Sequence, residues 1–301
     1  MKTPLLSVTL LVAGCAQGAV PGGPVPGADA PPGGPPPDAA PGVDIDAPPV
    51  VDIDAPPPMP AGAAALLLTE VVLAPTAGEF VEITNPTAQT VDLSTYYLSD
   101  SGQYFRLPAG APTMDANDFI VKFPAGATIA PGATITVAID TAANFTTTYG
   151  IAPTFSIASG TMTGIAASGA ATLTNGGEPI ILFQWNGQAD LVRDVDIVLA
   201  GVPSAANLLA DKSGVAIDGP DADTTPSTYA TDARTIPAQA AAPASGKSTK
   251  RVRFPAGHQL ATGTGNGLDG TDETSENTAA TWDTAFTNPT PGALPSGGLV
   301  P

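Results

Sequence analysis

The stretch that decides the fold is LLLTEVVLAPTAGEFVEITNPTAQTVDLSTYYLSD, residues 66–100. The apolar run 66–73 predicts a strand that is buried on one face and mostly covered on the other, and Pro75 ends it. In the segment that follows, Val81 and Ile83 alternate with a glutamate between them, which is the two-residue period of a strand. The stretch therefore predicts paired strands rather than helices.

Two turns divide the rest of this stretch. Asn85-Pro86 indicates the first, because the residue before a proline is disfavoured in helical backbone angles. The chain then passes through Val-Asp-Leu at 91–93 into an aromatic-rich strand, 96–100, and Ser101-Gly102 turns it again. The order of apolar strand, Glu-Phe-Val-Glu-Ile, Asn-Pro, Val-Asp-Leu and aromatic strand ending in Ser-Asp resembles the opening of lamin-tail domains. That resemblance implies an immunoglobulin-like β-sandwich.

The resemblance continues to about residue 294. The segment 119–139 reads FIVKFPAGATIAPG before an alternating strand, which matches the family's pattern, and Pro131-Gly132 suits the centre of a type II turn. Three later segments resemble the family as well: 173–183, the Asn186-Gly187 hairpin turn followed by the strand 191–198, and Trp282 to Ala293. We therefore expect one lamin-tail-like domain over 63–294 and a disordered tail at 295–301.

Composition independently favours an all-β fold. The 301 residues include 34 Pro and 33 Gly, which oppose long helices. The only short helix that we expect lies at 142–150, where Phe145 and Tyr149 are four residues apart and would pack on one side.

The charge balance argues against a nucleic-acid partner. The formal charge is −18, and such a field repels phosphates unless a strong local basic patch reverses it. The one basic cluster consists of Lys247, Lys250, Arg251 and Arg253. Acidic residues follow it closely, so we expect these four side chains to be solvated.

The chain opens with MKTPLLSVTLLVAGC, residues 1–15. Lys2 gives a short positive region, and the apolar run after it is too short to cross a bilayer as a helix. The pattern resembles a bacterial lipoprotein signal, whose lipobox is matched here by Val12, Ala13, Gly14 and Cys15. The resemblance implies that Cys15, the chain's single cysteine, carries a lipid that holds the protein at the outer membrane. The alternative is an ordinary secretory signal with an unrelated cysteine.

Residues 16–62 have a different composition. They contain 15 Pro, 8 Gly and 6 Asp and no aromatic, Lys or Arg residue. Such a segment buries too little apolar surface to offset its ordering entropy, so we predict a disordered spacer.

A long insertion is expected at about 200–246, which is rich in Ala, Pro, Thr and Asp. Structureless loops of this length are uncommon inside compact domains. The segment either lies over the sandwich or forms an exposed loop, and exposed loops are where a rigid scaffold usually carries binding residues.

Catalysis finds little support in the sequence. His258 is the single histidine, and it stands in a turn-like Phe-Pro-Ala-Gly-His segment without a Gly-x-Ser-x-Gly motif elsewhere. Three glutamates in the opening stretch, Glu70, Glu79 and Glu82, occupy positions that the family resemblance assigns to the scaffold. We therefore predict no catalytic residue and no enzyme.

Two acidic loops are candidates for calcium, which prefers closely spaced oxygen ligands. They are 218–223 and 266–273, and neither matches the twelve-residue calcium loop. In the second loop the metal candidates are Asp269, Asp272 and Glu273. No other cofactor is expected.

These observations predict a non-enzymatic lipoprotein of the cell envelope that presents a lamin-tail-like sandwich as a binding or structural module. Its expected partners are the membrane, through the N-terminal lipid, and an unidentified protein or polysaccharide at the cell surface. The alternatives are a calcium-dependent or carbohydrate-binding adhesion module, and an accessory domain that partners a secreted hydrolase.

Overall fold

The structure is a computed structural model that describes residues 66–110, 112–201, 211–232, 242–255, 258–259, 265–268, 270–294 and 298–299. The predicted signal at 1–15 and the predicted spacer at 16–62 lie outside the described residues, as does most of the predicted tail at 295–301. In the part of the chain that is described, no helix combines the length and apolar character needed to cross a membrane.

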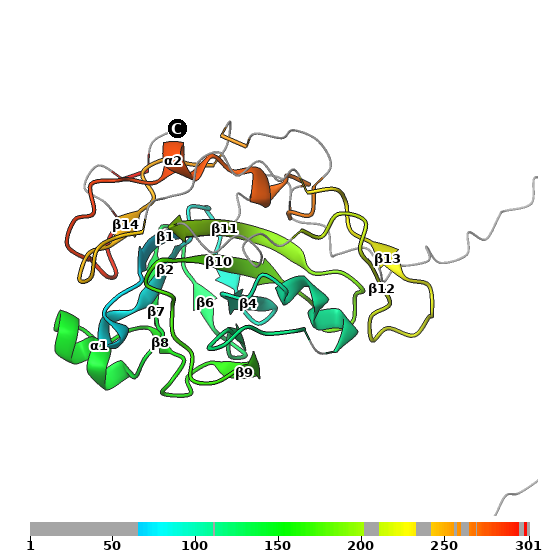
Figure 1. Cartoon of the computed structure of the whole chain (residues 1–301), viewed down its shortest axis with the longest axis horizontal. Helices are drawn as coiled ribbons and strands as arrows, with labels where there is room; N and C mark the ends of the chain where they lie inside the picture. The colour runs from blue at the N-terminus through cyan, green and yellow to red at the C-terminus, as the bar shows by residue number, and fades with distance from the viewer. Residues whose placement is uncertain are drawn as a thin grey trace, which may run out of the picture. The chain divides into compact units, whose positions relative to one another are not determined.

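Two five-stranded sheets form the body of the domain (Figure 1). The first has the order β14-β1-β2-β7-β8 and is antiparallel except for the parallel pair β7-β8. Its strands are β1 (Leu67–Val72), β2 (Phe80–Thr84), β7 (Thr134–Ala138), β8 (Phe155–Ser156) and β14 (Thr249–Lys250).

The second sheet has the order β11-β10-β4-β5-β9 and is antiparallel throughout. Its strands are β4 (Tyr96–Ser99), β5 (Phe119–Lys122), β9 (Thr163–Ala167), β10 (Gly177–Gln184) and β11 (Arg193–Gly201). Two small ladders pair β3 (Val91–Asp92) with β6 (Thr128–Ile129) and β12 (Ala216–Ile217) with β13 (Ser227–Thr228). The helices are α1 (Ala142–Tyr149), α2 (Thr278–Thr281) and the 3₁₀ helices η1 (Thr76–Gly78), η2 (Tyr104–Ala109) and η3 (Glu273–Ser275).

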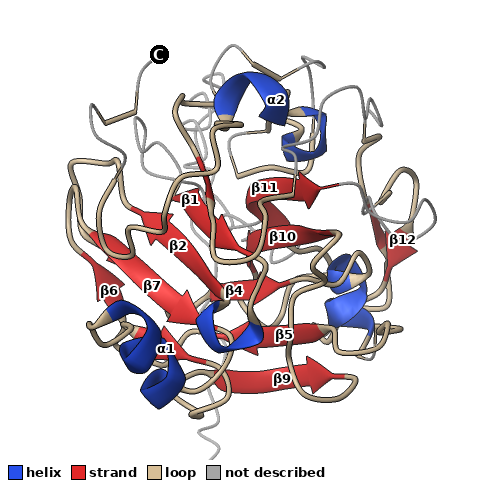
Figure 2. Cartoon of the chain, turned by 60° about the vertical axis from the view of Figure 1, so that its left-hand side comes forward, coloured by secondary structure: helices blue, strands red, loops and turns tan. Residues whose placement is uncertain are grey.

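The main core lies between the two sheets, which Figure 2 shows as two groups of strands. Alternating side chains of both sheets meet there, as face-to-face packing of sheets requires. They include Leu68, Val71, Val81, Ile83 and Val137 from the first sheet and Leu98, Val121, Leu182 and Val198 from the second. The predicted all-β, immunoglobulin-like sandwich is confirmed, and the opening stretch supplies three of its strands.

The outer face of the second sheet is also buried. A second apolar cluster covers it and includes Tyr97, Ile120, Ile181, Phe183 and Ile197 from the strands, Tyr104 and Phe105 from η2, and Ile217 and Tyr229. Burial on both faces explains why 180–183 is apolar without alternation. Residues 211–232 therefore lie over the sandwich, the first of the two arrangements considered for the predicted insertion.

The helix predicted at 142–150 is confirmed as α1. The side chain of Thr141 accepts the N–H of Asn144 at its start, and Phe145 packs edge-on against Phe80 of β2 with ring centroids 5.6 Å apart. Tyr149 packs on the same side, 4.7 Å from Phe145. The expectation that this is the only short helix is wrong, because α2 follows near the C-terminus.

The link between β10 and β11 differs from the tight Asn186-Gly187 hairpin that the sequence indicates. The ladder ends at the pair Gln184 and Arg193, so the predicted strand start at residue 191 is two residues early. The loop makes its own hydrogen bonds instead: Oδ1 of the Asn186 side chain accepts the N–H groups of Gln188 and Ala189, both at 2.8 Å.

Two glutamates of the opening stretch lie side by side on β1 and β2, where Glu70 is paired with Glu82. Both are buried and hold the C-terminal segment against the first sheet. The N–H of Thr290 donates to Glu70 Oε1 at 3.0 Å, and that of Gly292 donates to Glu82 Oε2 at 2.7 Å. Burial, and after it the charge of Glu70, raise the pKa of Glu82 to about 7. These side chains have a structural role, as the family resemblance implies.

This pair predicts a pH dependence of stability. The pKa of Glu82 is higher in the folded state than its ordinary value of 4.5, so its contribution is fully present below about pH 4.5 and is lost as the pH rises through about 7. We expect Glu82→Gln to reduce the fall in unfolding free energy between pH 4.5 and 7.5 by up to about 3 kcal/mol. Urea unfolding at both pH values measures this difference. Asp223→Asn, at an exposed position, should keep the wild-type pH dependence, and an unchanged fall in Glu82→Gln would contradict the assignment.

Candidate functional site

A network of polar side chains surrounds Arg251, which follows β14 and is fully buried. Its Nη2 lies 2.8 Å from both carboxylate oxygens of Asp196, and its Nη1 lies 2.6 Å from Glu276 Oε1. The guanidinium carbon lies 5.0 Å from the ring centroid of Trp282. Nη2 also donates to Glu276 Oε2 at 3.2 Å, so the guanidinium and Glu276 form the two-nitrogen, bidentate pair that suits arginine and carboxylate.

The same arrangement satisfies the backbone of β1. The Leu68 carbonyl accepts from Arg251 Nε at 2.8 Å, and its N–H donates to Asp196 Oδ2 at 2.7 Å. The register of β1 against β2 shifts between Leu68 and Glu70. Since unpaired buried backbone groups are costly, two side chains here take the place of strand hydrogen bonds.

Charge compensation governs this network. Burial raises the pKa of Asp196 to about 7, although the charge of Arg251 opposes that shift. Burial lowers the pKa of Arg251, but the carboxylates of Asp196 and Glu276 outweigh it, so the net shift is upward. Arg251 therefore remains charged at neutral pH, and its ion pairs hold β1, β11 and the C-terminal segment together.

A second buried network lies on the outer face of the second sheet. Lys212 Nζ is 2.9 Å from Asp194 Oδ2 and 3.1 Å from Asp232 Oδ2. The hydroxyl of Tyr104 donates to Asp194. Burial lowers the pKa of Lys212, and the two aspartates outweigh it, so the net shift is upward. This network attaches residues 211–232 to β11.

The basic cluster is not solvated as the sequence predicts. Lys250 and Arg251 are buried, because β14 joins the first sheet beside β1. Lys250 Nζ donates to the Asn288 carbonyl at 2.9 Å, and Lys247 Nζ donates to the Asn288 side chain at 2.7 Å. Arg253 is exposed. Three of the four basic side chains, Lys247, Lys250 and Arg251, therefore make contacts within the scaffold.

His258 and Glu79 occupy structural positions. The N–H of His258 donates to the Pro255 carbonyl at 2.9 Å, which is the predicted turn, and the side chain is partly exposed. Glu79 is buried, and its Oε2 accepts the N–H of Leu173 at 3.0 Å.

The predicted metal residues of 266–273 do not come together as a separate site among the described residues. Asp272 caps the start of η3, and its Oδ1 accepts the N–H of Thr274 at 3.1 Å. Glu273 Oε1 accepts the hydroxyl of Thr271 at 2.6 Å. Asp269 lies outside the described residues.

Two further groups of three acidic residues lie among the described residues. Glu273 lies in a group with Asp196 and Glu276, where one carboxylate oxygen of each is within 4.8 Å of the others, and Arg251 supplies positive charge there. The other group brings two residues of the predicted acidic loop 218–223, Asp218 and Asp221, close to Asp190, and Asp221 Oδ2 is buried without a hydrogen-bond partner in the described part of the chain. Asp190 lies in the loop between β10 and β11. Its carboxylate oxygens accept the N–H groups of Gly219 at 2.5 Å and Ser227 at 2.8 Å, which holds both residues against that loop.

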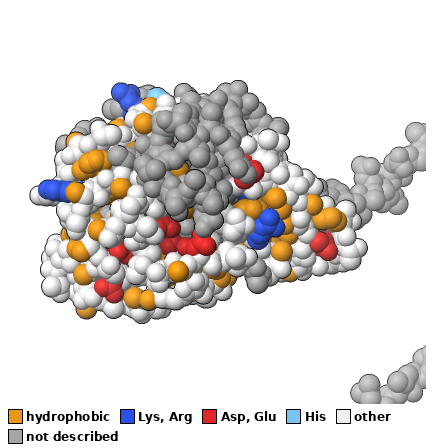
Figure 3. All heavy atoms as spheres, viewed as in Figure 1, with side chains coloured by type: hydrophobic (Ala, Val, Ile, Leu, Met, Phe, Trp, Pro, Cys, Tyr) orange, Lys and Arg blue, Asp and Glu red, His pale blue; other side chains and the backbone are white. Residues whose placement is uncertain are grey.

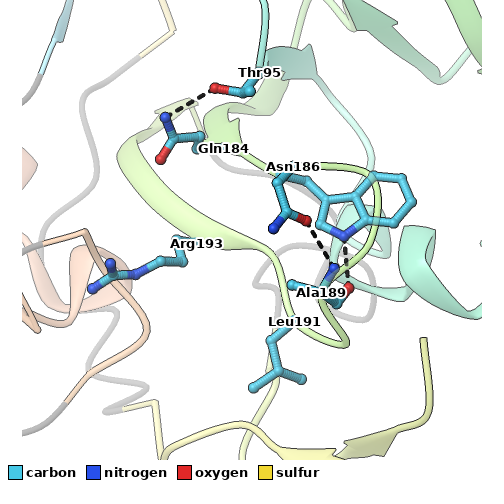
Figure 4. A pocket seen from close by; sticks show the side chains of 7 residues that line it. Thr95, Gln184, Asn186, Ala189, Leu191 and Arg193 are labelled. Carbon is cyan, nitrogen blue, oxygen red and sulfur yellow. Dashed lines mark hydrogen bonds between the residues drawn. The ribbon is translucent and has the colours of Figure 1, made fainter. Parts of the chain in front are cut away.

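A small depression lies beside the loop that joins β10 and β11 (Figure 4). Its cavity volume is about 20 Å³, and it is lined by Thr95, Gln184, Trp185, Asn186, Ala189, Leu191 and Arg193. Several polar groups that line the depression already have hydrogen-bond partners. The Gln184 side chain donates to Thr95 at 3.0 Å, and the indole N–H of Trp185 donates to the Ala189 carbonyl at 2.7 Å. A cavity of this size holds about one water, far less than a small-molecule pocket.

Comparison with known proteins agrees with the geometry of the sandwich. The family model described as Lamin Tail Domain matches residues 60–198. The match supports a lamin-tail domain that runs from the start of β1 into β11. It ends well before residue 294, so the resemblance suggested for the C-terminal part rests on the sequence pattern alone.

Two other comparisons add little. The crystal structure of a DUF4876 family protein from Bacteroides thetaiotaomicron resembles the chain with a TM-score of 0.41 and 13% identity, over 78% of this chain and 75% of that one. This likeness is too weak to support an argument. A search of curated proteins finds no significant match to the sequence.

Neither of the two buried ion networks was predicted from the sequence, although the composition of β11 indicates that buried charges occur there. Asp194 and Asp196 stand in an otherwise apolar strand, and aspartates are seldom buried without partners. Their partners, Lys212 and Arg251, follow 18 and 55 residues later in the chain, and no local pattern connects them.

We expect Arg251→Met to lower the unfolding free energy by about 3–5 kcal/mol, because it leaves two buried carboxylates without their cation. Adding Asp196→Asn and Glu276→Gln should restore part of that loss by removing the uncompensated charges. Lys247→Met, which removes a surface contact, should change stability by less than about 0.5 kcal/mol. Urea unfolding at pH 7 measures all three, and equal effects of the Arg251 and Lys247 variants would contradict the network's role.

Proposed function

We propose that the protein is a non-enzymatic lipoprotein of the cell envelope, attached to the outer membrane by a lipid on Cys15. Residues 16–62 serve as a spacer, and the lamin-tail domain is the presented module. The observation that carries the proposal is the position of the chain's single cysteine, directly after Val12-Ala13-Gly14 at the end of an apolar run. A spacer rich in proline then holds the folded domain away from the membrane surface.

The buried charges support a non-enzymatic role. Arg251 and Lys212 are each held by carboxylates that belong to the scaffold. Glu70 and Glu82 are engaged by the backbone of the C-terminal segment. Catalytic acids and bases need access to a substrate, and these groups are committed to joining distant parts of the chain.

A protein or a polysaccharide at the cell surface is the proposed partner. On the face shown in Figure 3, the charged side chains stand in small, separate groups, with hydrophobic side chains scattered between them. A surface of this kind suits recognition by shape and hydrogen bonding more than by strong charge attraction.

The lipid attachment predicts a clear result for Cys15→Ala in the producing cell. The native protein should incorporate radioactive palmitate and sediment with membranes, whereas the variant should carry no label and should lose most of its membrane association, because its lipid anchor is missing. Asp38→Ala, within the spacer, serves as the matched control and should behave as the native protein. Membrane association of the unlabelled variant at the native level would contradict the proposal.

A second candidate function is carbohydrate binding, which the depression at Trp185 favours. Its indole is partly exposed beside the amide side chains of Gln184 and Asn186. An aromatic face with neighbouring amides can stack on a sugar ring and hydrogen-bond its hydroxyls.

If this surface binds a polysaccharide, Trp185→Ala should weaken binding by about tenfold, and Trp185→Phe should retain part of it, because a ring remains for stacking. Binding to an array of cell-surface polysaccharides measures the change. Gln188→Ala, an exposed position in the same loop, is the control. Equal binding by Trp185→Ala and the native protein, with both variants folded by circular dichroism, would exclude this surface.

A further inference from the structure

A cluster of three buried carboxylates lies at one end of the second sheet. Asp100 directly follows β4, Asp118 directly precedes β5, and Glu178 is the second residue of β10. Their exposed fractions are 2%, 7% and 8%. One carboxylate oxygen of each lies within 4.8 Å of the corresponding oxygens of the other two. The order of the strands in the sheet, β10-β4-β5, brings the three together.

This cluster differs from the two ion networks in its charge balance. Burial raises the pKa of all three carboxyls, and the neighbouring charges that act on them belong to other carboxylates. Asp118 and Glu178 act on Asp100, and Asp115 acts on both Asp118 and Glu178. Among the described residues, no ion pair involves any of the three.

The hydrogen bonds of the cluster leave one oxygen without a partner. Asp100 Oδ1 accepts the N–H of Phe119 at 2.7 Å, which fixes the direction of the side chain. Asp100 Oδ2 is buried and accepts no hydrogen bond from the described part of the chain. A buried, unpaired carboxylate oxygen is costly unless another ligand satisfies it.

A polar cavity of about 190 Å³ adjoins the cluster. It is lined by Ser101, Gly102, Gln103, Thr113, Asp115 and Asp118. Asp118 belongs to both the cluster and the cavity, and Asp115 is exposed to solvent. The cavity has room for several water molecules, so it can supply water ligands next to the carboxylates.

We propose that Asp100, Asp118 and Glu178 bind a calcium ion, with water in the adjoining cavity completing its coordination. Calcium takes six to eight oxygen ligands in irregular arrangements, whereas magnesium requires a tighter octahedron. The ion supplies the positive charge that Arg251 and Lys212 supply in the other networks. This site lies apart from the two acidic loops that the sequence suggests, and it does not depend on lipid attachment.

The test is calcium titration of the purified full chain after treatment with a chelator, at pH 7.5. Isothermal titration calorimetry should detect one equivalent of bound calcium. At a calcium concentration about 100 times the Kd, the melting temperature should rise by about 5–10 °C over the chelated protein. Magnesium should bind at least about tenfold more weakly.

Isosteric variants locate the ion. Asp100→Asn, Asp118→Asn and Glu178→Gln should each weaken calcium binding at least about tenfold, because each removes a charged ligand. Their melting without calcium shows whether each is folded. Asp221→Asn and Asp272→Asn, in the two loops suggested by the sequence, should bind as the native protein does.

Three results would overturn the proposal. The first is a native protein that shows neither binding heat nor a calcium-dependent melting temperature. The second is a folded Asp100→Asn variant that binds calcium with native affinity. The third is loss of binding in Asp221→Asn or Asp272→Asn with retention in the cluster variants, which would place the ion in a loop instead.

Discussion

The ion pairs and hydrogen bonds of the buried Arg251 guanidinium are the interactions that hold the two sheets and the C-terminal segment together. The guanidinium contacts β1 of the first sheet through the Leu68 carbonyl, β11 of the second through Asp196, and the C-terminal segment through Glu276. Replacing such a pair by apolar residues can be neutral for stability, whereas removing one member is costly. The network therefore acts mainly by specifying one arrangement, since any other pairing of these three segments leaves charged groups buried and unpaired.

The buried ion pairs also bear on the boundary of the region that matches the lamin-tail model. The family match ends at residue 198, yet β1 and β11 carry acidic groups whose partners come later in the chain. Lys212 meets Asp194 on one face, and Arg251 meets Asp196 on the other. A fragment that stopped at the end of the match would expose these carboxylates and the apolar surface that residues 211–232 cover. In this chain the folding unit is larger than the matched region.

The sequence was sufficient where the determining contacts are local. Alternation at 80–84 and the spacing of Phe145 and Tyr149 predicted β2 and α1, because each pattern reports one face of one element. The alternation pattern was not sufficient at β11, where the pairing with β10 skips Val195. This bulge sends Asp194 and Asp196 to opposite faces, which strict alternation does not allow. The cluster of Asp100, Asp118 and Glu178 was not predicted for another reason: its members lie in or next to three strands that become neighbours only in the folded sheet.

Buried carboxylates in this protein fall into three classes that differ in what balances them. Asp194 and Asp196 have cations from the chain itself, and Glu82 has backbone and hydroxyl donors. Asp100 has one backbone donor and a second oxygen with none. The chain has 10 Lys plus Arg and 28 Asp plus Glu, so its own cations can balance only a minority of its carboxylates. A bound cation can provide the missing charge, and calcium sites of this kind cover a wide range of affinities that depends on ligand charge and rigidity. A calcium ion at Asp100 would then join β4, β5 and β10 at one end of the second sheet as Arg251 joins the two sheets at their edge.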